Sequence, residues 1–249
     1  MTYTKQTYEI KNTSKPNFFI GSKIRGALGY ALKEEVCVNP TFVCKDCFAA
    51  KECIFYQFYE EHNTTHNYRL DFKLYTDKYK FSLLLFEDAQ NYKDILHTAM
   101  MHSLKEYKKI KFKSKTKLIK EKKLSKTIKL EFITPLRIKK QNRFAIKEIE
   151  LLDILLSIYR RNLELNKLPY ERVKLDTTYK TVLKNLRYQE ITRRSNKQDT
   201  LMNLGGIMGE MVISNVSREV YNLLKTGEII GVGKSTVFGL GKIKIEDIG

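Results

Sequence analysis

Long apolar runs are missing from this chain. The longest apolar patches, residues 83–86 and 151–158, are short or interrupted by polar residues, and neither approaches the roughly 18 apolar residues that a membrane-spanning helix needs. No apolar run follows the first residues either, so no signal peptide is expected. We therefore predict a soluble, cytoplasmic protein that needs no membrane.

Acidic residues are scarce relative to basic ones. The 249 residues include 46 Lys and Arg but only 28 Asp and Glu, which leaves a formal net charge of +18. Such an excess favours a polyanionic partner, first nucleic acid and second an acidic membrane surface. The 15 Tyr and 13 Phe add rings on which bases can stack. The alternative is that codon bias in an AT-rich genome raised the lysine content.

A complete nucleotide-binding loop is also missing, although residues 231–241 contain part of one. Four glycines lie in this segment, which suits a backbone that passes close to another backbone or to a ligand. Gly233-Lys234-Ser235-Thr236 looks like the end of a phosphate-binding loop. However, Glu228 stands where that motif needs glycine, and no helix follows. We therefore expect no bound nucleotide.

Hydrophobic periodicity and helix-end signals together predict four helices. Three follow from apolar residues at helical spacing, over residues 20–32, about 88–107 and 149–163. Ser217 is placed to begin a fourth helix as its N-cap, and Gly227 to end it. The stripe of the third helix that is predicted to face the core consists of Ile149, Leu152, Leu156, Tyr159 and Leu163.

The predicted strands and helices follow one order twice. Strands are expected at 2–10, 67–76, 79–87, 128–133, 179–191, 204–214 and 237–246. With a strand inside the lysine-rich stretch described next, each half reads β-α-β-β-α-β. This is the ferredoxin-like order that RNA-recognition modules also use. We predict an α+β protein with two tandem ferredoxin-like (RRM-like) βαββαβ domains, residues 1–123 and 124–249, and a small cysteine-rich insertion at 37–53.

A lysine-rich stretch lies near the predicted domain boundary. Residues 105–126 hold eleven lysines and two glutamates. Within this stretch, Lys111, Lys113, Lys115 and Lys117 alternate with other residues, so a strand would place all four on one side. That row is either a surface that faces RNA or the solvated edge of a sheet that lysines protect from pairing.

All four cysteines of the chain fall in seventeen residues. Cys37, Cys44, Cys47 and Cys53 form a C-x6-C-x2-C-x5-C pattern, and a cytoplasmic chain should not oxidise them to disulfides. The Cys44-x2-Cys47 pair is the usual chelating knuckle, and the outer two thiolates would complete a tetrahedral site. A structural zinc ion is expected; an iron–sulfur cluster and unligated cysteines are the alternatives. Four protein ligands would leave no open position for catalysis.

Three segments, in order along the chain, carry a resemblance to a known family. They are Gly21–Leu32, the pair Arg193–Gln198 and Leu204–Glu210, and the glycine-rich Gly231–Gly241. Together they resemble the CRISPR-associated endoribonucleases of the RAMP superfamily, the sixth Cas family, which cut precursor CRISPR RNA within its repeats. The cysteine cluster that leads into Ile54–Glu60 is similar to a feature of one branch.

The resemblance implies two ferredoxin-like folds with repeat RNA across the groove between them. It implies metal-independent cleavage, in which the ribose 2′-hydroxyl attacks the adjacent phosphate and leaves a 2′,3′-cyclic phosphate and a 5′-hydroxyl. Other CRISPR effector subunits are further possible partners. A non-catalytic RAMP subunit that binds guide RNA in an effector complex is the alternative function.

The acid and base of this reaction are hard to assign because no histidine lies between residues 1 and 61. Many relatives have a histidine on or just after the first helix, where this chain has Tyr30. We expect Tyr30 to orient or protonate, with Lys23 or Lys33 supplying charge or a base. Alternatively, His62 or His66 folds back into the site, or the protein binds RNA with little catalysis. His97 and His102 are expected to be surface or packing residues.

Contacts with RNA are expected at three further places besides the lysine row. They are Arg25 on the first helix; Arg193, Arg194 and Lys197 in a polar segment between strands; and the glycine-rich segment, with the backbone N–H groups of Gly231 and Gly233 and the side chains of Lys234 and Ser235. For the polar segment the alternative is an ordinary basic hairpin, and for the glycine-rich segment it is close packing between the two folds.

Overall fold

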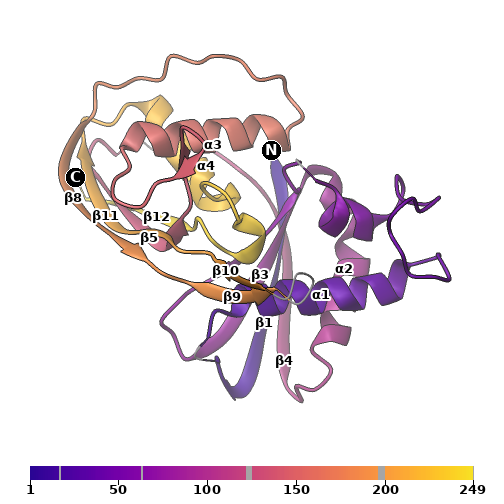
Figure 1. Cartoon of the computed structure of the whole chain (residues 1–249). Helices are drawn as coiled ribbons and strands as arrows, with labels where there is room; N and C mark the ends of the chain where they lie inside the picture. Colours follow the sequence, from indigo (N-terminus) through magenta and orange to yellow (C-terminus); the bar gives the residue numbers. More distant parts are fainter. Residues whose placement is uncertain (17, 63, 122–124, 196–199, 249) are drawn as a thin grey trace. The chain divides into compact units, whose positions relative to one another are not determined.

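The computed structural model describes all residues except 17, 63, 122–124, 196–199 and 249 (Figure 1). The chain forms two compact units. The first comprises Met1–Leu70 and Thr76–Leu118, and the second comprises Asp71–Tyr75 and Ile119–Gly249. Each unit is built around one sheet and two helices.

The first unit has the predicted order of elements. These elements are β1 (Thr2–Ser14), α1 (Ile20–Val36), β2 (Tyr68–Phe72, whose last two residues belong to the second unit), β3 (Lys78–Phe86), α2 (Lys93–Ser103) and β4 (Ile110–Leu118). The sheet runs β2-β3-β1-β4, and β1 pairs antiparallel with both β3 and β4. Both helices cover the same face of this sheet (Figure 1).

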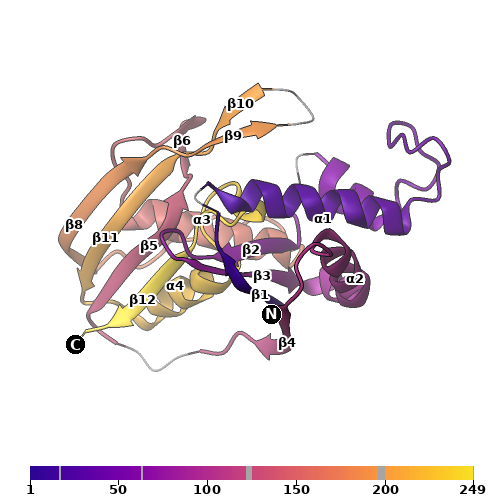
Figure 2. The same ribbon diagram turned by 90° about the horizontal axis from the view of Figure 1, so that it is seen from below.

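The second unit repeats this order. Its elements are β5 (Ile128–Leu136), α3 (Leu151–Leu165), β8 (Lys180–Gln189), β11 (Gly206–Ser214), α4 (Arg218–Ile230) and β12 (Ile243–Asp247). The sheet runs β12-β5-β11-β8 and is antiparallel, with α3 and α4 on one face (Figure 2). Two hairpins are added, β6 (Lys139–Lys140) with β7 (Arg143–Phe144) and β9 (Thr192–Ser195) with β10 (Thr200–Asn203).

In both sheets, the first and third strands of the βαββαβ order lie in the middle and the second and fourth at the edges. The prediction of an α+β protein with two tandem ferredoxin-like folds is therefore confirmed. In the first unit, alternation along β1 turns Tyr8 into the core, where it stacks on Phe81 and contacts His97 and Phe112. The burial of Tyr8 raises the pKa of its hydroxyl.

The predicted core stripe of α3 is shifted by one position. Leu151, Ile154, Leu155 and Ile158 are buried, whereas Leu152 is 37% exposed. Apolar residues occupy both sides of this helix, so its periodicity fits two adjacent phases, and packing against α4 selects one of them.

Other element boundaries also differ from the predictions. Helix α4 continues through Gly227 to Ile230, and Gly231, with φ of 85°, ends it instead. Inside the helix, position 227 is a glycine because a Cβ there would lie 2.5 Å from the Ile158 side chain. The predicted helix over 88–107 consists of a 3₁₀ helix at Glu87–Tyr92 followed by the shorter α2. The last strand begins at Ile243 rather than 237 because a 3₁₀ turn occupies Thr236–Phe238.

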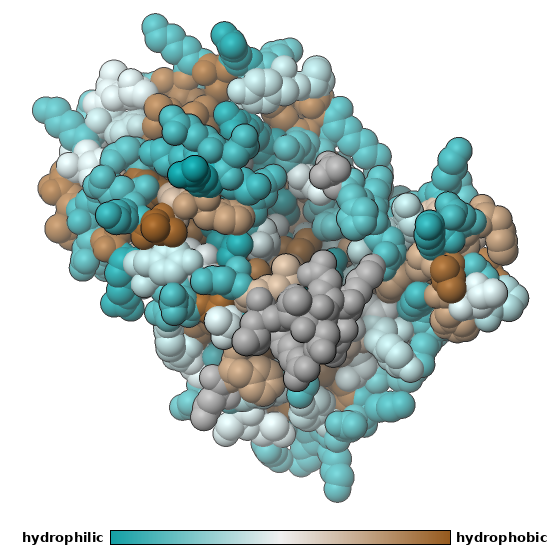
Figure 3. Space-filling model, viewed as in Figure 1, coloured by the Kyte–Doolittle hydropathy of each residue, from teal (hydrophilic) through white to brown (hydrophobic). Residues whose placement is uncertain are grey.

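The cysteine-rich insertion, residues 37–53, follows α1 and contains turns but neither helix nor strand; all of it lies in the described part of the chain. A π-helix at Tyr56–Glu60 leads back toward β2. Figure 3 shows brown apolar side chains among teal ones on this insertion, at the right of the view. Across the described residues, no helix combines the length and apolar character that crossing a bilayer requires.

Two glycines of α1 allow a matched test of its packing. A Cβ at Gly26 would meet nothing within 4 Å, whereas at Gly29 it would lie 2.6 Å from the Tyr59 ring. That ring cannot easily move aside, because it stacks on Phe55 and its hydroxyl donates to the Arg25 carbonyl. Since alanine favours a helix over glycine, we expect Gly26→Ala to stabilise the protein by about 0.5–1 kcal/mol. Gly29→Ala should instead destabilise it by about 1–3 kcal/mol through overpacking.

Urea unfolding followed by circular dichroism measures both changes. Equal effects of the two substitutions would contradict the packing of Tyr59 on α1.

Candidate functional site

Three of the proposed catalytic residues lie along one side of α1. Lys23 and Tyr30 are exposed and Lys33 is half-buried, while the other side of the helix buries residues such as Leu28 and Leu32. The side-chain nitrogens of the two lysines lie over aromatic rings: Nζ of Lys23 is 5.5 Å from the centre of the Phe18 ring, and Nζ of Lys33 is 5.1 Å from that of Phe55. Helical spacing therefore gathers these side chains, as the sequence predicted.

Tyr30 belongs to a polar cluster that joins α1 to α2. A hydrogen bond with Glu34, then the negative charge of Glu34, and then slight desolvation raise the pKa of the Tyr30 hydroxyl. On α2, His102 has its Nδ1 3.2 Å from Glu35 Oε1 and its Nε2 3.9 Å from Glu34 Oε2. Tyr30 is 72% exposed, so the cluster opens to solvent. The Tyr30 hydroxyl is therefore protonated at neutral pH, in a hydrogen bond with Glu34.

His102 is a partly exposed residue, as the prediction of a surface or packing role allows, but its contacts with Glu34 and Glu35 were not predicted. The residue is more than sixty positions away from Glu34 and Glu35 along the chain, and only the packing of α2 against α1 brings them together. His97 is a packing residue, with its ring stacked 3.8 Å from that of Phe112 and the pKa of its imidazole lowered by burial.

His66 and Arg25 meet at a second place in the first unit, around Tyr68. The guanidinium of Arg25 donates from Nε to the Tyr68 hydroxyl (2.9 Å) and from Nη2 to the Phe58 carbonyl (3.2 Å), and it lies 4.3 Å over the Tyr59 ring. His66 Nδ1 is 3.1 Å from the Gln57 carbonyl, and its ring is 5.9 Å from that of Tyr68. Arg25 therefore directs several of its N–H donors to partners within the first unit. The sequence did not indicate these internal contacts.

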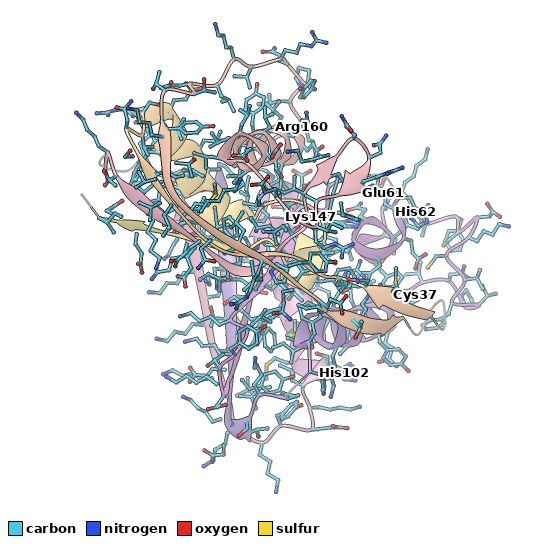
Figure 4. The ribbon with its side chains drawn as sticks, turned by 60° about the vertical axis from the view of Figure 1, so that its left-hand side comes forward. Cys37, Glu61, His62, His102, Lys147 and Arg160 are labelled. Carbon is cyan, nitrogen blue, oxygen red and sulfur yellow. The ribbon has the colours of Figure 1, made fainter. Side chains whose placement is uncertain are left out.

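The remaining candidate histidine, His62, is exposed just after the π-helix. Figure 4 shows His62 and His102 well apart within the first unit. The two histidines therefore belong to different parts of the surface.

The predicted lysine strand is present as β4, at the edge of the first sheet. Lys111, Lys113, Lys115 and Lys117 are all exposed, and Phe112 lies on the other face, against His97 and Tyr8. In the register with β1, Lys115 lies opposite Lys5. The result is a row of like charges along an unpaired strand edge.

The glycine-rich loop is closely packed within the second unit. A Cβ at Gly233 would lie 2.5 Å from the Arg137 carbonyl oxygen, and one at Gly241 would lie 1.9 Å from that of Val232. The N–H groups of Gly231, Gly233 and Lys234 donate to the Gly227 carbonyl, to Ser157 Oγ and to the Arg137 carbonyl. The sequence interpretation required the N–H groups of Gly231 and Gly233 to be free to bind a phosphate. They are not free, because both donate to acceptors inside the fold. What the loop offers outward is the exposed Lys234 side chain, next to Ser235 in a left-handed conformation.

The β9–β10 hairpin reaches this loop through Arg193. The Arg193 guanidinium lies 4.6 Å over the ring of Phe238, and its Nη2 is 3.0 Å from the sulfur of Met202. Arg194 lies on β9 opposite Leu201, whereas Lys197 falls outside the described residues. Two segments that the sequence assigned separately to RNA binding are thus side by side.

Arg137 forms hydrogen bonds with both the β9–β10 hairpin and the glycine-rich loop. Its Nη1 donates to the carbonyls of Asn203 (2.8 Å) and Gly205 (3.1 Å), at the end of the hairpin, while its own carbonyl accepts from Lys234. The guanidinium also lies 4.2 Å over the Phe144 ring, and burial lowers its pKa. This role of Arg137 could not be predicted, because nothing in its spacing sets it apart from other basic residues.

The four cysteines are free thiols that line one cavity of about 200 Å³. Within the described parts of the chain, no three His, Cys, Asp or Glu side chains lie close enough together to hold a metal ion.

Two family models match the chain, one in each half. The family model described as CRISPR-associated endoribonuclease Cas6 matches residues 130–243, and one described as an N-terminal domain matches residues 2–129. No curated protein sequence matches the chain.

Solved structures match over the whole chain at low sequence identity. The product complex of a Thermus thermophilus Cas6 is 14% identical, with 99% of each chain covered and a TM-score of 0.63. A RAMP protein that binds different RNA substrates is 10% identical, with coverage of 99% and 100% and a TM-score of 0.50. A partial Cas6-RT-Cas1–Cas2 complex is 12% identical, with 98% of this chain and 46% of that chain covered and a TM-score of 0.57.

The contact between Ser157 and the glycine-rich loop can be tested directly. Replacing Ser157 with alanine leaves the Gly233 N–H without its acceptor, which should cost about 1 kcal/mol of stability. Ser157→Thr retains the hydroxyl and should recover most of that loss. Urea unfolding of the two variants measures the difference, and equal stability of Ser157→Ala and the wild type would contradict this contact.

Proposed function

Residues 130–243 of this chain belong to the Cas6 family of CRISPR-associated endoribonucleases, and from this membership we propose that the protein cleaves precursor CRISPR RNA within its repeats, in the cytoplasm. The match to that family is the observation that carries the proposal. Two further features support it: the doubled ferredoxin-like fold that the chain has in common with Cas6 structures, and the net charge of +18.

The proposed chemistry needs no metal. The ribose 2′-hydroxyl attacks the adjacent phosphorus and loses its proton, the bond to the 5′-oxygen breaks, and that oxygen gains a proton. The products are a 2′,3′-cyclic phosphate and a 5′-hydroxyl. Such a reaction needs an acid, a base and positive charge beside the phosphorane.

Tyr30 is our candidate for the acid. Its hydroxyl is exposed and carries its proton at neutral pH, and the proposal rests on this exposed position on α1, since the raised pKa by itself makes the hydroxyl a weaker acid. Lys23 and Lys33, on the same side of α1, would stabilise the charge of the phosphorane. His66 is the candidate base from the neighbouring segment.

RNA would be held by the outward-facing cations of each unit. In the first unit these are the lysines of β4, and in the second it is Lys234; Arg193 and Arg194 of β9, next to the loop, are proposed to join it. Further CRISPR proteins are proposed partners, since one matching structure is a Cas6-RT-Cas1–Cas2 complex. The lack of a histidine on α1 favours one alternative, a RAMP subunit that binds guide RNA without cutting it.

Removing the Tyr30 hydroxyl tests the acid. We expect Tyr30→Phe to slow single-turnover cleavage of labelled repeat RNA about 100-fold in EDTA, since general acid catalysis typically contributes this much. Tyr170→Phe makes the same change at a 60% exposed tyrosine on the second unit and should cleave at the wild-type rate.

Single substitutions Lys23→Ala, Lys33→Ala and His66→Gln then assign the remaining roles. A 2′-deoxy substitution at the cut site should block cleavage entirely. If Tyr30, Lys23, Lys33 and His66 can all be replaced without loss of rate, this site assignment is wrong. Tight binding with no cleavage by the wild type would favour the RNA-binding subunit instead.

The lysines of β4 are tested through salt dependence. Each phosphate contact that is lost should make the negative slope of log K against log salt shallower by about 0.7 for single-stranded RNA. We expect this change for Lys115→Ala, and weaker binding at every salt concentration. Lys105→Ala, at an exposed lysine before the strand, should leave the slope unchanged. Binding titrations at several salt concentrations measure the slopes, and identical slopes for Lys115→Ala and the wild type would restrict β4 to its role as a sheet edge.

A further inference from the structure

The cysteine-rich insertion brings four thiols to a single cavity. Cys37, Cys44, Cys47 and Cys53 all line it, and its other walls are mainly apolar, with Val36, Val43 and Ala50 among them. None of the four is in a disulfide. Four thiols in a mainly apolar pocket have few polar partners unless they bind something: the Cys37 thiol, for example, makes a long contact of 3.6 Å to the Asn39 carbonyl.

The insertion has little else to hold it in one conformation. Its seventeen residues form turns only, and its larger apolar side chains stay in solvent: Val38 is 67% exposed, Val43 53% and Phe48 80%. A segment that buries so little apolar surface needs a crosslink to be stable. Its hydrogen bonds, such as those of Asn39 to Thr41 and Val43 and that of the Ala50 N–H to the Cys47 carbonyl, each close a single local turn.

Two of the cysteines are fixed and two lie in the turns between them. Cys37 caps α1, where its N–H donates to the Lys33 carbonyl, and the Cys53 carbonyl accepts from Gln57 in the following helical segment. Cys44 and Cys47 share one turn, closed by a hydrogen bond from the Cys47 N–H to the Cys44 carbonyl. Two anchored cysteines and one C-x2-C knuckle are a ligand pattern that structural zinc sites use.

We infer that the four cysteines bind one zinc ion, which crosslinks the insertion to the end of α1. Each thiol loses its proton, so four protons are released when Zn²⁺ binds four thiolates. Zinc–sulfur distances of about 2.3 Å are shorter than the present spacing of the side chains allows, so binding contracts the cavity. The site carries a formal charge of −2, which Lys45 and Lys51 of the insertion help to offset.

The zinc site would also steady the residues that pack under α1. Phe55 and Tyr59 follow Cys53 directly and stack on each other, and Tyr59 donates to the Arg25 carbonyl of α1. Lys33, one of the proposed catalytic residues, lies over Phe55. The ion has no open coordination position, so its role is structural and independent of whether the protein cleaves RNA.

Metal analysis of protein purified without added zinc tests the inference. We expect one zinc per chain, no iron and no absorption band near 400 nm. The four thiols should react with a disulfide reagent only after a strong chelator removes the metal. This measurement needs no substitution, so misfolding of a variant cannot confuse it.

Substitutions provide the second arm. Cys44→Ser and Cys47→Ser should each lose more than half of the zinc and melt at lower temperature, whereas Phe48→Ala, at an exposed neighbour, should keep one zinc per chain. Full zinc content in both cysteine variants, or rapid reaction of all four thiols in untreated protein, would overturn the inference, and bound iron would replace zinc with an iron–sulfur cluster. A protein that holds zinc but does not cleave RNA would refute the proposed function alone.

Discussion

Arg137 joins three parts of the second unit, and the position of the candidate RNA-binding residues depends on it. Its carbonyl accepts the Lys234 N–H, and its buried guanidinium donates to the carbonyls of Asn203 and Gly205. Because the backbone of Gly233 passes so close to that of Arg137, no side chain fits there. The glycines of the glycine-rich loop therefore serve primarily to allow close backbone packing. The loop's outward chemistry comes from the side chains it presents, since its amides are largely used inside the fold.

The first unit places its candidate chemistry on a helix that also carries much of the core. One side of α1 packs through Ile24, Leu28 and Leu32, so the opposite side is held rigidly. Tyr30 on that side is joined through Glu34 to His102 of α2. A histidine thus lies near the first helix after all, but a different helix supplies it. The site combines lysines that suit a phosphate with carboxylates that do not, which distinguishes it from a plain basic surface.

The order of elements could be predicted from the sequence because hydrophobic periodicity reports local structure. Both ferredoxin-like folds and the lysine strand followed from it, and so did the grouping of Lys23, Tyr30 and Lys33. The phase of α3 and the end of α4 could not be predicted, since apolar residues on both sides of α3 and the tight contact of Gly227 with Ile158 are resolved only by packing. The internal roles of Arg25 and Arg137 could not be predicted either, because the sequence does not distinguish an arginine that faces water from one that donates to buried carbonyl oxygens.

The lysines of β4 also bear on how the sequence can change. A free strand edge is protected from pairing with other chains by charge, and either sign repels a second copy of the same edge. Glutamates would serve that purpose in a protein whose only need was to remain dispersed. If the four cations also bind RNA, as proposed, drift at these sites should conserve sign more strictly than residue type, with lysine and arginine interchangeable and acidic residues disfavoured.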